Sequence, residues 1–428
     1  MRVALLLAGC WALAAMVGVA PAAAQLSGHG GPVRAIAVSA DGGTALSGSF
    51  DGSAILWALQ RGVALQVLRY HDGAVNAVAL LPDGRAVTGG QEGRIALWKR
   101  GEQKPAAVLE GHQGPISALA VSPDGQWLAS GSWDRTIRLW PLAGGIPRVL
   151  EGHQQAVNGL AFAADGAALV SVGYDATLRL WALRDGAAPR VMTLAVPLNA
   201  VAVARDGEIV AGGADGKLYF LAATGEEQGT LEVSATPVTA LAIDGRGASI
   251  AAASVGGTVV LADRVTRRVL QTFVESGPPV WAVAFLPDGR SLLTGGADRL
   301  IRRWDAATGK PIGAAVAGEV ADPLAAYAGD PGARVFRACV ACHALTQDAG
   351  NRAGPSLHGI FGRRIASLPG YDFSPALKRL DIVWTPETVA KLFEIGPARY
   401  TPGTKMPEQH IGAEDRAALI RFLERATQ

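Results

Sequence analysis

A segment of about 41 residues recurs seven times along the first three quarters of the chain. The best-preserved copies run from a His through alternating apolar residues and an Asp-Gly turn to Ser-Gly-Ser-x-Asp and a closing Trp. The closing position is held in order by Trp57, Trp98, Trp140, Trp181, Leu221, Ala262 and Trp304. A period of about 40 to 45 residues with a Gly-His pair and a closing Trp is typical of the four-stranded blades of circular all-β propellers. The repeat therefore predicts seven blades, with the strands of the first near 33–38, 44–48, 53–58 and 63–69.

Four positions of this repeat resemble those of the WD-repeat family. In that family a His, a Ser or Thr, an Asp and the closing Trp form a hydrogen-bonded tetrad within a blade. The first, third and fourth units carry the full set, namely His29, Ser47, Asp51, Trp57, His112, Ser130, Asp134, Trp140, His153, Ser171, Asp175 and Trp181. The resemblance implies a seven-bladed WD-repeat β-propeller over residues 25–317.

The other four units depart from the tetrad. The second has His71 but carries Glu92 in place of the Asp, and the last has Ser276 where the His would stand. The fifth keeps only Asp215, and the sixth keeps none of the four. A partly buried carboxylate must be paired by donors, so we expect the complete blades to be the stiffer ones.

A His, a Ser and an Asp within reach of one another are also the components of a hydrolytic triad. A catalytic set occurs once in a protein, whereas this set recurs at the repeat spacing. We therefore interpret the propeller histidines as structural and expect no catalytic residue among the tetrads.

The first 24 residues have the pattern of an export signal. Arg2 is followed by an apolar run over 3–20 and by three alanines, 22–24, as a cleavage site. Two alternatives remain open: the stretch 7–10, ending at Cys10, resembles a bacterial lipoprotein box, and the uncut run is long enough to span a bilayer. We expect cleavage after Ala24 and a periplasmic protein, attached to a membrane only if this segment is retained or lipidated.

Charge and cysteine content exclude two classes of protein. The formal net charge is +2, which gives no field of the kind that binds nucleic acid. Only three cysteines are present, too few for a disulfide-rich scaffold. The position of the last two is informative, because Cys339, Cys342 and His343 form a CxxCH sequence.

A CxxCH sequence is the signature of covalent c-type haem attachment. On a helix the two thiols and the imidazole share one face, so two thioether bonds and one iron ligand converge on a single porphyrin. A zinc half-site or a disulfide would not explain the adjacent His343, and the chain has no second cysteine pair to complete a zinc site. The iron needs a sixth ligand or an open site, and Met406 is the sole methionine after the motif.

Nearly the whole of residues 329–428 resembles small class I cytochromes c, which are all-α, while the Ala/Gly-rich residues 318–328 form a linker. The matching stretches after the haem motif are 354–363, 369–371, 384–385, 400–407 and a final helix over 413–426. The resemblance implies that a first helix crosses this last helix, with Gly332 allowing close approach to Leu419 and Phe422.

The same resemblance implies one covalently bound haem c whose iron is held by His343 and Met406. It also implies that the Pro355 carbonyl orients His343, and that Arg363 and Trp384 hold the haem propionates. With both axial positions filled, the chemistry is the cycling of iron between its ferrous and ferric forms.

These features favour an exported carrier of single electrons whose propeller docks a protein redox partner. Two alternatives stay open: a propeller-based oxidoreductase that uses the haem as electron acceptor, and an assembly factor of a respiratory or dehydrogenase complex. The propeller holds no unexplained cluster of ionisable residues, so a carrier is favoured over a catalyst.

Overall fold

The computed structural model describes residues 25–102, 104–184, 186–274, 277–312, 324–327, 329–336, 339, 343–346, 354–371, 373–404, 406 and 411–428. The predicted leader 1–24, most of the predicted linker 318–328, Ser276 and Cys342 lie outside these residues. Among the described residues, no helix has the length and apolar character needed to cross a bilayer.

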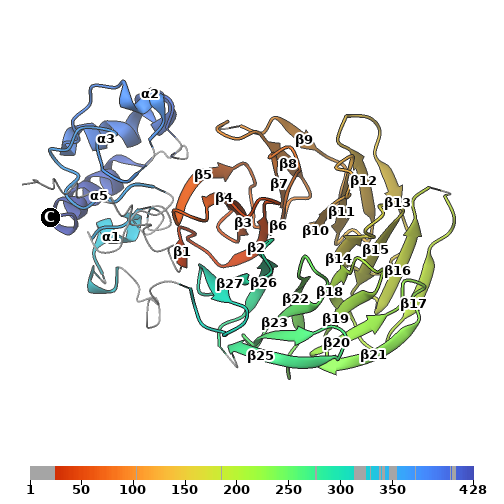
Figure 1. Cartoon of the computed structure of the whole chain (residues 1–428). Helices are drawn as coiled ribbons and strands as arrows, with labels where there is room; N and C mark the ends of the chain where they lie inside the picture. Colours follow the sequence, from red (N-terminus) through yellow and green to blue (C-terminus); the bar gives the residue numbers. More distant parts are fainter. Residues whose placement is uncertain are drawn as a thin grey trace, which may run out of the picture.

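Seven four-stranded antiparallel sheets are arranged as the blades of a ring (Figure 1). In each of blades 1 to 6 the four strands follow one another in sequence, from the innermost strand outward. Blade 1 contains β2 (Val33–Val38), β3 (Thr44–Ser49), β4 (Ser53–Ala58) and β5 (Val63–Arg69). Blades 2 and 3 contain β6 (Val75–Leu80), β7 (Ala86–Gly90), β8 (Ile95–Trp98), β9 (Ala107–Leu109), β10 (Ile116–Val121), β11 (Trp127–Ser132), β12 (Ile137–Pro141) and β13 (Arg148–Leu150).

The remaining blades follow the same plan. Blades 4 and 5 contain β14 (Val157–Phe162), β15 (Ala168–Gly173), β16 (Thr177–Ala182), β17 (Arg190–Thr193), β18 (Leu198–Val203), β19 (Ile209–Gly213), β20 (Lys217–Leu221) and β21 (Glu227–Glu232). Blade 6 contains β22 (Val238–Ile243), β23 (Ser249–Ser254), β24 (Val259–Asp263) and β25 (Arg268–Val274), and blade 7 contains β26 (Val280–Phe285), β27 (Ser291–Gly296) and β28 (Leu300–Asp305). The prediction of a seven-bladed all-β propeller is confirmed.

The ring closes through a strand from the start of the described chain. β1 (Gln25–Ser27) pairs antiparallel with β28, with Gln25 opposite Arg302 and Ser27 opposite Leu300, and completes the sheet of blade 7. The sequence suggested a last strand near 312–316 instead. Residues 313–316 lie outside the described part, and the outer strand of this sheet is β1.

The glycine in the repeated Ser-Gly-Ser stretch has a packing role. A Cβ on Gly48 would lie 2.7 Å from Val75 Cγ1 of blade 2, and one on Gly295 would lie 2.6 Å from Val33 Cγ1 of blade 1. Gly89, Gly131 and Gly212 meet the next blade in the same way. The absence of a side chain lets each innermost strand seat its first apolar residue against the preceding blade, as close packing requires.

A belt of side-chain hydrogen bonds, which the repeat pattern did not predict, also links neighbouring blades. The second residue of an innermost strand donates to the backbone carbonyl that begins the next innermost strand. These pairs are Ser117 with Val157, Asn158 with Leu198, Asn199 with Val238, and Thr239 with Val280. The second residue of these strands is polar because the buried carbonyl of the next innermost strand needs a hydrogen-bond donor.

The C-terminal part is helical where the structure describes it. It contains a short 3-10 helix (Ala325–Tyr327), α1 (Pro331–Phe336), α2 (Pro375–Lys378), α3 (Pro386–Ile395), α4 (Pro397–Tyr400) and α5 (Ala413–Ala426). Thr385 caps α3 by accepting a hydrogen bond from Thr388 N at 3.2 Å, with Pro386 at the first helical position. α5 carries Glu414 and Asp415 in its first turn and Arg425 in its last, which matches the helix dipole.

The first and last of these helices cross at Gly332. A Cβ there would lie 2.2 Å from the Ala418 carbonyl oxygen and 2.4 Å from Phe422 Cβ, so only glycine permits this approach. The Phe336 and Phe422 rings lie 5.4 Å apart beside this contact, and both are fully buried. The crossing closes one side of the helical core.

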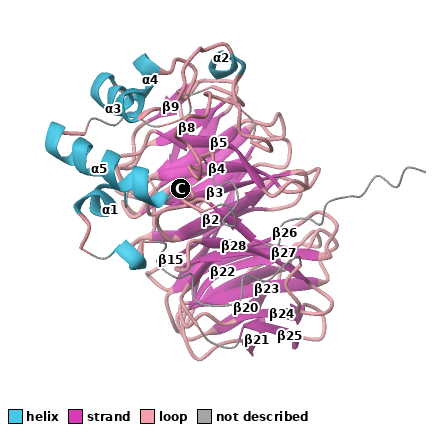
Figure 2. Ribbon diagram, turned by 90° about the vertical axis from the view of Figure 1, so that its left-hand side faces the viewer, coloured by secondary structure: helices cyan, strands magenta, loops and turns pink. Residues whose placement is uncertain are grey.

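Figures 1 and 2 show the helices gathered on one side of the propeller, beside the strands of blade 1 and beside β1. This placement brings the outer strand β5 next to the site described below.

Candidate functional site

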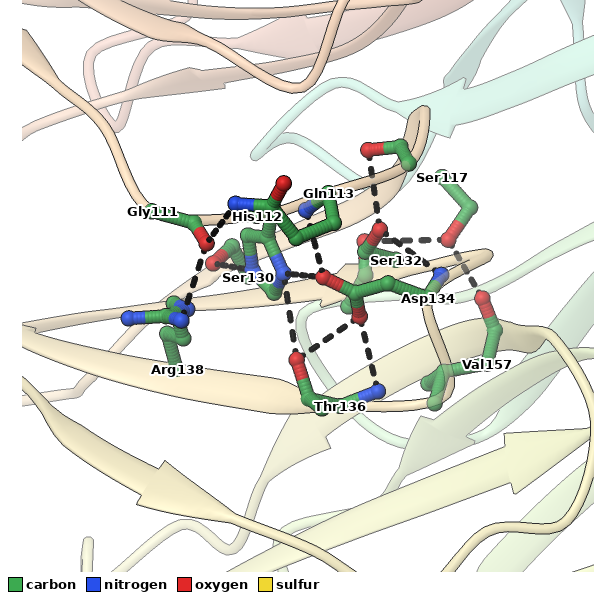
Figure 3. Close-up of polar contacts among 12 residues, drawn as sticks. Gly111, His112, Gln113, Ser117, Ser130, Ser132, Asp134, Thr136, Arg138 and Val157 are labelled. Carbon is green, nitrogen blue, oxygen red and sulfur yellow. Dashed lines mark hydrogen bonds and ion pairs between the residues drawn. The ribbon is translucent and has the colours of Figure 1, made fainter.

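The tetrads of blades 1, 3 and 4 form continuous chains of hydrogen bonds. In blade 3, Trp140 Nε1 donates to Ser130 Oγ at 2.8 Å. Ser130 Oγ lies 2.8 Å from His112 Nε2, and His112 Nδ1 lies 2.8 Å from Asp134 Oδ2 (Figure 3). Thr136 Oγ1 donates to the second carboxylate oxygen at 2.7 Å. Every polar atom of this chain is thus used inside the blade, which supports a structural role.

The tetrad carboxylates stay ionised. Burial alone would raise the pKa of Asp134, but the hydrogen bonds from His112, Thr136 and backbone amides outweigh burial and hold its pKa well below its ordinary value. The pKa of Asp51 is lowered in the same way, with His29 as the main donor against burial. A carboxylate that is fully satisfied in this manner is a poor proton acceptor, and therefore an unsuitable general base.

The incomplete blades replace the missing partners with other side chains. In blade 2, Glu92 takes the place of the Asp and contacts His71 Nδ1. In blade 5, Tyr219 donates its hydroxyl to Asp215 at 2.8 Å, and burial together with this contact raises the pKa of Tyr219 to about 12. In blade 7, Arg302 Nε donates to Asp298 at 2.9 Å. The fifth unit has lost the other tetrad residues, yet its Asp215 is still paired.

Replacing Asp134 with alanine is expected to lower the free energy of unfolding by about 1–3 kcal/mol, because His112 and the Gln113 amide lose a buried acceptor. Chemical denaturation measures this change. The matched control is Asp165→Ala, an exposed turn aspartate that accepts one backbone hydrogen bond, from Ala167 N. It should shift stability by less than about 0.5 kcal/mol. Loss of haem reduction in a folded Asp134→Ala protein would contradict the structural role.

The site of interest is a cavity in the helical part. It measures about 1380 Å³, which includes space open to solvent, and both His343 and Met406 line it. Its walls are mainly apolar, with Leu357, Ile360 and Phe393 among them. The structure thus brings His343 and Met406, which lie far apart in the sequence, to the wall of one cavity.

His343 is held in one orientation. Its Nδ1 lies 2.8 Å from the Pro355 carbonyl oxygen, to which it donates a hydrogen bond. This bond selects the tautomer in which Nε2 carries the lone pair, as is usual for a metal-binding imidazole. His343 N also donates to the Cys339 carbonyl at 2.9 Å, so one helical turn separates the imidazole from that buried cysteine.

Met406, which also lines the cavity, lies in the segment that follows α4. Its backbone N donates to Thr404 Oγ1 at 3.1 Å, and its side chain packs against the helical core. The thioether of a methionine is the group that ligates haem iron together with a histidine in cytochromes c.

Arg363 and Trp384, to which the resemblance assigns the haem propionates, both line the cavity, and Arg363 also has contacts within the chain. Its guanidinium donates to the carbonyls of Ser356 at 2.8 Å and His358 at 3.2 Å. Burial lowers the pKa of Arg363 from its ordinary value, although a guanidinium remains charged. Arg363 therefore fixes the loop that carries Pro355, and with it the orientation of His343.

Two lining residues come from the propeller, and the sequence did not lead us to them. Val67 and Arg69 of β5 reach the cavity wall. One feature of the sequence could have indicated that β5 is covered. Its residues, Val-Ala-Leu-Gln-Val-Leu-Arg, are mostly apolar on both faces, whereas an outer strand usually has one polar face in contact with solvent.

The lining fits haem c in its charges as well as its ligands. Among the described lining residues, all those with a permanent charge are arginines, namely Arg69, Arg363 and Arg364, and none is acidic. A porphyrin with an apolar body and two carboxylates matches an apolar cavity with cationic side chains at its wall.

Comparisons with known proteins agree with both parts of the chain. The model for cytochrome c matches residues 329–427, and the model for the WD domain, G-beta repeat, matches residues 22–58, 62–99, 103–141, 144–182 and 267–305. The five matched segments omit the fifth and sixth repeat units, which lack most of the tetrad. The C-terminal part is 39% identical over 99 residues to cytochrome c of Gibberella zeae, covering 23% of this chain and 92% of the relative.

Cytochrome c of Arabidopsis thaliana is 41% identical over 99 residues, covering 23% of this chain and 88% of the relative. Cytochrome c type-1 of Ascaris suum is 42% identical, also over 99 residues, covering 22% of this chain and 85% of the relative. Through residues 329–427 the chain belongs to the cytochrome c family, with covalently bound haem c, and this domain follows a seven-bladed propeller of WD40 repeats.

Proposed function

We propose that this protein is an exported carrier of single electrons, with haem c ligated by His343 and Met406 and with the propeller as the docking platform for a protein redox partner. The cytochrome c domain suggests electron transfer, and the WD40 propeller suggests protein interaction. The observation that carries the proposal is that one apolar cavity is lined by both His343 and Met406.

When bound, the haem supplies reversible one-electron chemistry at iron. The chain's own residues hold it in place for that purpose. Pro355 orients the imidazole, Arg363 fixes the Pro355 loop, and buried residues such as Leu392 and Leu423 exclude water from the cavity. His343 and Met406 would hold the haem iron from two sides of its coordination, and the bound group would supply electron transfer without an open ligand position, which suits a carrier rather than a catalyst.

Exposed aromatic residues support the docking role of the propeller. Phe50, Trp133 and Tyr174 occupy the same repeat position, directly before the tetrad acid, and so lie on one face of the ring. Trp133 is 60% exposed and Tyr174 is 54% exposed. Large exposed aromatic side chains are enriched where proteins bind one another.

The proposed location is the periplasm. The signal-like leader 1–24 supports export, and haem attachment through two thiols suits a compartment in which unprotected cysteines are oxidised. Membrane attachment would require that the leader is retained, or that Cys10 is lipidated.

The reduced full-length holoprotein is expected to keep a low-spin six-coordinate spectrum under carbon monoxide at neutral pH. Both axial positions are filled in the proposed site, so carbon monoxide has no place to bind. Visible absorbance before and after exposure to the gas measures this. Rapid uptake by the unmodified protein would overturn the carrier role and favour the alternative, an oxidoreductase that acts at the haem.

A further inference from the structure

The outer strand of blade 1, β5, differs from the outer strands of blades 2 to 6. β9, β13, β17, β21 and β25 each contain exposed residues, and Val149 of β13 and Val191 of β17 are 42% and 48% exposed. In β5 no residue is exposed, and the burial pattern alternates between buried and half-buried. Figures 1 and 2 show why: the helical domain lies beside this strand. β5 is therefore covered by the haem domain.

Two residues of β5 reach the haem cavity itself. Val67 and Arg69 are separated by one residue, so their side chains leave the same face of the strand. The residues between and before them, Leu68 and Gln66, are buried on the propeller side. Gln66 there accepts a hydrogen bond from Gly101 N at 2.8 Å and fixes the strand. The strand is thus anchored in the propeller while its other face borders the haem site.

The three cationic side chains at the cavity have different roles. Arg363 donates to two backbone carbonyls, and Arg364 forms a 3.4 Å ion pair with the exposed Asp381. Arg69 is the one that the propeller contributes. A guanidinium is always charged, so Arg69 adds a fixed positive charge to the cavity wall.

We propose that Arg69 is a haem-site residue supplied by the propeller, whose guanidinium stabilises the haem carboxylates and the ferrous state of the iron. A fixed positive charge disfavours the additional positive charge of ferric iron. The propeller would then set the reduction potential of the haem through direct contact. This inference rests on the attached haem and holds whether or not the protein passes electrons to a partner.

The test is the midpoint potential of full-length holoprotein carrying Arg69→Gln, measured by spectroelectrochemistry. For an illustrative separation of about 10 Å and an effective dielectric constant of about 20, the loss of one unit charge changes a ferric–ferrous equilibrium roughly tenfold. Arg69→Gln should therefore lower the potential by about 59 mV, the one-electron equivalent of a tenfold change. Arg69→Lys keeps the charge and should retain most of the potential.

The matched control is Arg148→Gln on β13, an outer-strand arginine whose guanidinium donates to the Leu183 carbonyl away from the haem domain. The midpoint potential of the Arg148→Gln protein should equal that of the unmodified protein. An unchanged potential in folded Arg69→Gln protein, or an equal fall in both variants, would overturn the proposal.

Salt concentration gives an independent measurement. A charge enclosed beside the haem is little screened, so the difference between Arg69→Gln and the unmodified protein should persist from about 0.01 M to about 1 M salt. A difference that vanishes at high salt would show that Arg69 acts as a solvent-exposed charge and would contradict its placement at the haem.

Discussion

The Met406→Ala holoprotein is expected to bind carbon monoxide stoichiometrically in its ferrous form, whereas the unmodified protein binds none. Alanine cannot ligate iron, so the sixth position becomes available. The weak sulfur-to-iron absorption of the ferric protein, near the red end of the visible spectrum, should disappear as well. The reduction potential should fall, because the electron-accepting thioether that favours ferrous iron is lost.

The matched control for this variant is Met192→Ala. Met192 lies in β17 of blade 4, where it packs against the apolar contact between blades 4 and 5. Its removal should leave carbon monoxide binding, the sulfur-to-iron absorption and the reduction potential unchanged, while lowering the stability of the propeller. Retention of the sulfur band after Met406→Ala would show that Met406 is not the sixth ligand.

The Gly332→Ala protein is expected to lose about 3 kcal/mol or more of haem-domain stability, or to fail to fold that domain. The new methyl group would lie 2.2 Å from the Ala418 carbonyl oxygen, which belongs to helix backbone and cannot move aside. Forcing α1 away from α5 separates Phe336 from Phe422 and opens the core. Denaturant unfolding followed by haem absorbance measures the effect.

Gly412→Ala is the matched control, because a Cβ at Gly412 would contact nothing within 4 Å. Gly412 caps α5 and alanine is a poorer cap than glycine, so about 0.5–1 kcal/mol should be lost. Equal stability of the two variants would mean that the crossing of α1 and α5 is not as tight as the structure shows.

The propeller could be predicted from its sequence because each blade repeats the same local pattern. The strands expected at 33–38, 53–58 and 63–69 coincide with β2, β4 and β5. Ring closure could not be predicted, because Gln25–Ser27 is three residues long and has no strand pattern of its own. Its partner β28 lies at the other end of the propeller sequence, and only the tertiary structure brings the two strands together.

The haem site could be predicted only for the residues whose side chains attach haem or bind iron. Cys339, His343 and Met406 were selected by residue type and spacing, and the position of Pro355 was implied by family resemblance. The contribution of Arg69 was not predictable, because nothing in a single strand reveals which domain covers it. The same holds for the pairing of Asp215 with Tyr219, where a neighbour on β20 replaces the usual histidine.

The strand β1 imposes an order on folding. Its partner β28 is synthesised after all the intervening blades, so the ring cannot close until residue 305 has been made, and the edge of β28 stays unpaired until β1 reaches it. An unpaired edge of this kind is a site for wrong pairing between chains. Pairings so distant in sequence also form slowly. A bulky group fused directly before Gln25 would interfere at this late step, and would reduce the yield of closed rings without altering the stability of those that form.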